Sequence, residues 1–143
     1  MTNPTSGHTV ESFNEEMRRE HRTVLEMGAL VRHQIRNAAK TLRDEDSEAA
    51  RKVIADDLEV NALDIQVAAH VEAILARRTP VASDLREVLT VAKIATDLER
   101  CGDEAGKLAK LTIHFFDSPG IAPNYQLLQE VSKVAGFVDL MLQ

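Results

Sequence analysis

The sequence predicts an all-α fold, in which an up-down three-helix bundle is followed by a partial C-terminal helix. Over long stretches, apolar residues recur at steps of three, four or seven, which is the spacing of one face of an α-helix. Aromatic residues make up only 3% of the chain and Trp is absent, so aliphatic side chains must fill the core, which favours helices packed on helices. A length of 143 residues suits one such domain.

The first two helices are separated by a short acidic break. Residues 13–42 carry apolar side chains on one helical face and predict a long amphipathic helix. Residues 44–47 are turn-prone, and Ser47 is the expected N-cap of the second helix. One apolar seam of that helix repeats every seven residues, at Val53, Val60, Val67 and Ile74. Thr79-Pro80 ends the helix, because proline cannot continue the backbone hydrogen-bond ladder.

The third helix is expected over residues 84–115, with Ser83 and Asp84 as its cap. It is apolar almost all round, which predicts that other elements surround it on several sides. A fourth amphipathic segment begins near Tyr125. Its apolar residues are expected to lack partners and to drive self-association: Leu128, Val131, Val138 and Leu142.

The predicted organisation has four parts. Residues 1–9 are expected to be a disordered N-terminus and residues 10–116 a three-helix bundle. Residues 117–124 contain two prolines and a glycine and form a linker. Residues 125–143 are the start of a second bundle, whose pattern stops at Gln143 without a capping residue, so the chain is expected to be cut short.

Composition excludes several classes of function. The net charge of -6 and the pI near 5.3 disfavour contact with nucleic acid and with anionic lipid. Neither a signal peptide nor the roughly 18 consecutive apolar residues of a membrane span are present in the sequence. Cys101 is the sole cysteine, so no internal disulfide forms and a cytosolic location is expected.

Acidic residues on the apolar side of the second and third helices are the main candidates for chemistry. Glu99 and Asp103 are four residues apart and project from one helical face, as do Asp57 and Asn61, with Asp64 two turns beyond Asp57. Carboxylates in such positions usually have a cation or a hydrogen-bond partner, and a bound metal would supply the cation. Oxygen ligands suit Mg, Mn, Ca or iron, without excluding zinc. The alternative is pairing with basic side chains, for which Arg51, Lys93 and Arg100 are available.

No catalytic constellation accompanies these acids. The stretch Gly102 to Leu108 lacks the spacing and the Ser or Thr of a phosphate loop, and no strand is expected before it. The histidines form no Glu-x-x-His pair of the kind that di-iron bundles use, which argues against a carboxylate-bundle enzyme. Cys101 lies in an apolar helix without a nearby base, so packing is its expected role.

Ordered motifs on three successive helices resemble one known family. The string Pro-Val-Ala-Ser-Asp-Leu-Arg ends at Arg86, and Leu-Glu-Arg-Cys-Gly-Asp follows at residues 98–103. Upstream, Val53-Ile54 precedes Asp-Leu-Glu-Val-Asn at residues 57–61, and Met27-Gly28 lies on the first helix. These motifs are similar to those of the PhoU family, and the resemblance covers residues 13–111.

The resemblance implies a fold and a metal site. PhoU proteins contain two similar three-helix bundles with acidic motifs that hold iron or other metal clusters, so this chain is expected to be a fragment or a natural short form. Metal roles are implied for Asp57, Asn61, Glu99 and Asp103, with iron as the first candidate and Zn, Mn or Mg as others. Asn61 departs from the stricter acidic motif, and Cys101 replaces the usual aliphatic residue.

The resemblance also implies a function without catalysis. A PhoU protein is a negative regulator of phosphate uptake and of phosphate-starvation signalling. Its implied partners are the ATPase subunit of the phosphate ABC transporter and the sensor histidine kinase, so the chain would be cytoplasmic and held peripherally at the inner membrane. Arg86 is the implied contact residue, with an ion pair to Asp84 or Glu87 as an equal alternative. The alternative function is a metal-binding helical module that dimerises and has no phosphate role.

Overall fold

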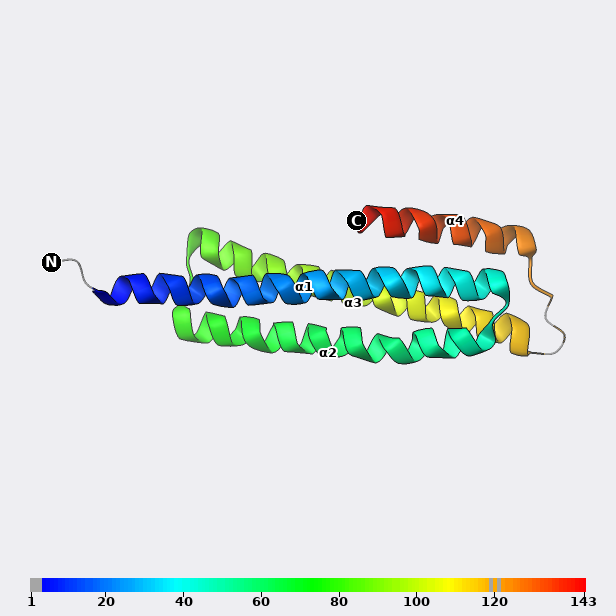
Figure 1. Ribbon diagram of the computed structural model, residues 1–143, viewed down its shortest axis with the longest axis horizontal. Helices are drawn as coiled ribbons and strands as arrows, with labels where there is room; N and C mark the ends of the chain where they lie inside the picture. The colour runs from blue at the N-terminus through cyan, green and yellow to red at the C-terminus, as the bar shows by residue number, and fades with distance from the viewer. Residues whose placement is uncertain (1–3, 119, 121) are drawn as a thin grey trace.

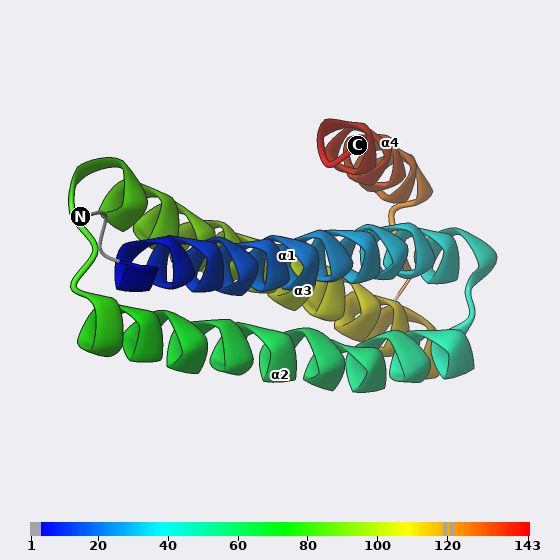
Figure 2. The same ribbon diagram turned by 60° about the vertical axis from the view of Figure 1, so that its left-hand side comes forward.

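A computed structural model describes residues 4–118, 120 and 122–143. Within them all regular structure is helical: α1 (Pro4–Asp44), α2 (Ser47–Arg78), α3 (Ala82–Asp117) and α4 (Tyr125–Met141). The first three helices lie side by side as an up-down bundle, and α4 packs against the C-terminal half of α1 (Figures 1 and 2). The predicted all-α class and three-helix bundle are confirmed.

Helix α1 begins earlier than the sequence suggested. It starts at Pro4, so residues 4–9 continue the helix that we expected to begin after a disordered segment. Proline suits the first position of a helix, because its missing N–H would have no intrahelical partner there. Residues 1–3 of the same expected segment lie outside the described residues.

The helix caps differ from expectation at two places. The carboxylate of Asp46, and not Ser47, caps α2 by accepting a hydrogen bond of 2.9 Å from the Ala49 N–H. The N-cap of α3 is Val81, which has no capping side chain, so Ser83 and Asp84 fall inside the first turn. Shifts of one or two residues at a helix end are hard to read from sequence.

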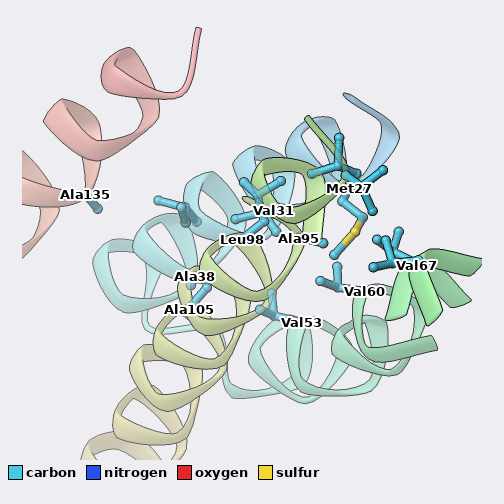
Figure 3. Close-up of a cluster of buried hydrophobic side chains, with 14 of the residues drawn as sticks. Met27, Val31, Ala38, Val53, Val60, Val67, Ala95, Leu98, Ala105 and Ala135 are labelled. Carbon is cyan, nitrogen blue, oxygen red and sulfur yellow. The ribbon is translucent and has the colours of Figure 1, made fainter. Parts of the chain in front are cut away.

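The core lies along the axis of the three-helix bundle. The predicted seven-residue seam of α2 is buried throughout, at Val53, Val60, Val67 and Ile74. Met27 of α1 points toward Val60 and Val67, and Ala95 and Leu98 of α3 close the layer (Figure 3). One side of α3 is nevertheless open, since Leu89 and Leu111 are about half exposed, so the prediction that other elements surround this helix is wrong there.

The inner face of α4 has partners. Leu128 is 8% exposed, and Val138 and Leu142 pack against the core, which corrects the expectation that these residues lack contacts. They are covered because α4 folds back onto α1, a contact between segments far apart in the sequence. A different set of large apolar side chains on α4 is exposed: Leu127, Val134, Phe137, Leu140 and Met141.

Candidate functional site

The four predicted metal residues lie on two helices that pack together. Asp57 and Asn61 are on α2, Glu99 and Asp103 are on α3, and these helices are in extensive contact. Burial raises the pKa of Glu99 above its ordinary value, and the negative charges of Asp103, Asp64 and Asp57 raise it further. The structure therefore brings acidic groups of both helices close enough to repel one another.

Helix α1 adds a residue that sequence analysis missed. Gln34 is only 4% exposed, and its Nε2 donates a hydrogen bond of 3.3 Å to Oδ1 of Asp57. Within the described residues, Oε1 of Gln34 and Oδ1 of Asn61 are buried without a hydrogen-bond partner. We call Gln34, Asp57, Asn61, Glu99 and Asp103 the oxygen-rich layer.

Gly102 lets α3 approach this layer closely. A Cβ atom at Gly102 would lie 3.0 Å from Oε1 of Gln34 and 3.1 Å from Oδ1 of Asp57. Such contacts are shorter than ordinary van der Waals contacts. A side chain at this position would therefore displace the amide or the carboxylate, and glycine keeps the backbone of α3 against both.

The basic side chains proposed as alternative partners are mostly engaged elsewhere. Arg51 pairs with Glu48 and with Asp117. Lys93 pairs with Asp97 at 3.1 Å. Arg100 is near enough to lower the pKa of Glu99, yet in the part of the chain that the structure describes no acid of the layer forms an ion pair.

The donor set of the layer suits a hard cation. Its members present carboxylate and amide oxygens, which Mg, Mn, Ca and iron accept, and a cation would relieve both the repulsion at Glu99 and the unpaired amide oxygens. Across the described residues, no three His, Cys, Asp or Glu side chains lie close enough together to hold an ion by themselves. The amide oxygens are therefore needed to complete a site here.

Arg86 lies in the N-terminal part of α3, away from the oxygen-rich layer. It lines an open groove of about 590 Å³ between α1 and α3, together with His21, Leu25, Glu87 and Ile94. Glu87 pairs with His21 at 3.3 Å, and the described residues include no ion pair of Arg86 with Asp84 or Glu87. The guanidinium of Arg86 is thus exposed at the rim of a partly apolar groove.

Cys101 is half-buried beside the layer. Burial raises the pKa of its thiol, and the charge of Asp97 raises it further. Both effects disfavour the reactive thiolate, in agreement with a packing role.

The fold and site define a helical bundle with a partly buried oxygen-rich layer and an exposed groove at Arg86. The chain belongs to the PhoU family: the family model described as the PhoU domain matches residues 24–112, more than half of the chain. Among the described residues, no helical segment combines the length and the hydropathy needed to cross a membrane.

Several curated proteins are similar over most of the chain. It is 36% identical over 136 residues to the phosphate-specific transport system accessory protein PhoU homolog of Pseudomonas aeruginosa, covering 95% of this chain and 55% of that protein. It is 34% identical over 109 residues to the phosphate-specific transport system accessory protein PhoU of Escherichia coli (strain K12), covering 76% of this chain and 45% of that protein. The chain therefore spans about half the length of the curated relatives that it matches.

Proposed function

We propose that this chain is a non-enzymatic accessory of a phosphate-specific transport system, which restrains phosphate uptake and starvation signalling by contact. The observation that carries the proposal is 36% identity across 95% of the chain to a protein named as an accessory protein of the phosphate-specific transport system. The proposed partners are the ATPase subunit of the transporter and the sensor histidine kinase. Such contacts would hold a cytoplasmic chain at the inner membrane.

The groove at Arg86 supports regulation by contact. Its lining combines an arginine, a His–Glu pair and exposed aliphatic side chains, of which Leu25 is 73% exposed and Ile94 42%. Arginine beside an apolar surface is typical of residues that dominate protein interfaces. Arg86 is therefore the proposed contact residue.

Co-purification tests this proposal. The tagged chain is expected to recover the transporter ATPase subunit from phosphate-grown cells, and Arg86→Ala should recover less of it. Lys110→Ala is the matched control, because Lys110 is exposed on the same helix but lies outside the groove. Absence of the ATPase subunit in both ample and scarce phosphate would overturn the proposal.

A second proposed property is metal binding by the oxygen-rich layer, with iron first and Zn, Mn or Mg as alternatives. It is supported by the raised pKa of Glu99 and the two unpaired amide oxygens. Elemental analysis of protein purified without a His-tag or added metal tests it. Stoichiometric metal that is lost in Glu99→Ala/Asp103→Ala is the expected result, and metal-free wild-type protein would contradict it.

A further inference from the structure

Gln34 occupies a place in the bundle where an apolar side chain would be expected. Its neighbours on the same face of α1, Met27, Val31 and Ala38, are fully buried. A polar side chain on such a face is costly unless both of its polar atoms are paired. Only Nε2 of Gln34 is paired, so Oε1 remains an acceptor without a donor.

The orientation of this amide follows from its partner. The carboxylate of Asp57 only accepts hydrogen bonds when ionised, so the NH₂ group of Gln34 must face Oδ1 of Asp57. The carbonyl Oε1 then points to the surface of α3 at Gly102, 3.0 Å from where a Cβ would stand. One side chain thus orients a carboxylate of α2 and presents an oxygen toward α3.

We propose that Gln34 is the contribution of α1 to the cation site, where it positions Asp57 through Nε2 and offers Oε1 as an additional oxygen donor. The inference rests on the proposed metal binding by the oxygen-rich layer. It explains how a site can form where three acidic side chains do not converge. It also explains the glycine at residue 102, which leaves room for both oxygens. A bound cation would then connect all three helices of the bundle.

Calorimetric titration of the apo chain with Mn²⁺ tests the role of Gln34, because Mn²⁺ prefers oxygen donors and remains divalent. Gln34→Met keeps the length of the side chain and removes both polar atoms. It is expected to weaken Mn²⁺ binding by roughly 10- to 100-fold, the usual effect of losing a group that orients a metal ligand. Gln34→Glu restores an oxygen donor without the NH₂ group and should bind Mn²⁺ more tightly than Gln34→Met.

Thr41→Val is the matched control. Thr41 is also a buried polar residue of α1, 3% exposed, and its hydroxyl is bonded to that of Thr112, outside the oxygen-rich layer. This variant should change thermal unfolding of the apo chain and leave Mn²⁺ affinity unaltered. If wild type and Gln34→Met bind Mn²⁺ equally, Gln34 has a structural role only and the inference fails while the metal site stands. If wild type binds no Mn²⁺, the inference and the metal site fail together, while the proposed role in phosphate transport is untouched.

Discussion

Arg36 on α1 donates a hydrogen bond of 2.8 Å from Nε to Oδ2 of Asp139 on α4. Arg32, one turn earlier on α1, donates to the other carboxylate oxygen at 3.0 Å. These bonds link two helices that also share apolar contacts, and Asp139 lies in the last turn of the largely apolar α4. The two arginines therefore fix how α4 docks on the bundle.

Asp139→Asn should loosen α4 without unfolding the bundle. The substitution removes the charge that both guanidinium groups contact, so amide hydrogen exchange in α4 is expected to accelerate several-fold at pH 7 while exchange in α2 stays unchanged. Asp97→Asn is the control, because Asp97 pairs only locally with Lys93 on α3. Equal exchange of α4 in wild type and Asp139→Asn would show that apolar contacts alone hold the helix.

The carboxylate of Asp139 makes the docking of α4 depend on pH. The hydrogen bond from Arg36, with a further one from Arg32, holds the pKa of Asp139 below its ordinary value of 3.8. Because the folded pKa is lowered, the stabilisation is complete above 3.8 and is lost only as the pH falls through the folded pKa. Titration of the Asp139 carboxyl by NMR should give a midpoint below 3.8, which Arg36→Gln moves upward. A midpoint at or above 3.8 in wild type would contradict the docking.

Gly102→Ala should destabilise the bundle, whereas Gly106→Ala should stabilise it. Alanine favours a helix by about 1 kcal/mol over glycine at either position. At Gly102 the new Cβ crowds Gln34 and Asp57, and overpacking of this kind costs about 1–3 kcal/mol. At Gly106 nothing lies within 4 Å of the new atom. Urea unfolding measures the free energy of unfolding of both variants. Equal changes in the two variants would show that α3 does not approach the oxygen-rich layer so closely.

Glu99→Gln should stabilise the metal-free chain at pH 7. The pKa of Glu99 is raised above 4.5, so its ionisation destabilises the folded chain. This loss of stability grows as the pH rises from 4.5 through the folded pKa. Removing the charge should raise the thermal midpoint by roughly 1–4 °C at pH 7 and change little at pH 4. Glu72→Gln, at an exposed position of α2, is the control. A lower midpoint at pH 7 would mean that Glu99 has a cationic partner.

Self-association should depend on the outer face of α4. Phe137 is 64% exposed and Val134 60%, and exposed apolar residues gathered on one helix are typical of interfaces. Wild type is expected to form homo-oligomers at high concentration in analytical ultracentrifugation, and Phe137→Asp should remain monomeric. Leu58→Asp, which alters a residue 72% exposed on α2, should behave as wild type. A wild-type monomer at high concentration would refute the prediction.

The sequence predicted those parts of the fold that depend on periodicity within one helix. The seven-residue seam at Val53, Val60 and Val67 is buried as expected, because a repeat of that spacing leaves one face to bury. Periodicity could not predict how α4 docks on the bundle. Its two apolar faces have similar spacing, and only the contact with α1, through Arg32 and Arg36, decides which face is covered.

The candidate site was predicted from its acidic members and from Asn61. Asp57, Glu99 and Asp103 stand out because acids are unusual on an apolar face. Gln34 was missed, although a polar residue on the same helical face as Met27, Val31 and Ala38 was a signal that could have been used. Its pairing with Asp57 joins residues on different helices, and such a contact depends on how the helices pack rather than on spacing along the chain.

The rate of phosphate uptake tests the central claim most directly. Cells whose own PhoU is deleted would be grown in ample phosphate, with and without this chain supplied from a plasmid. We predict that the chain lowers uptake toward the level of undeleted cells, and that Arg86→Ala does so less well than Lys110→Ala. Unchanged uptake in cells that contain the folded chain would contradict the claim that it restrains phosphate transport.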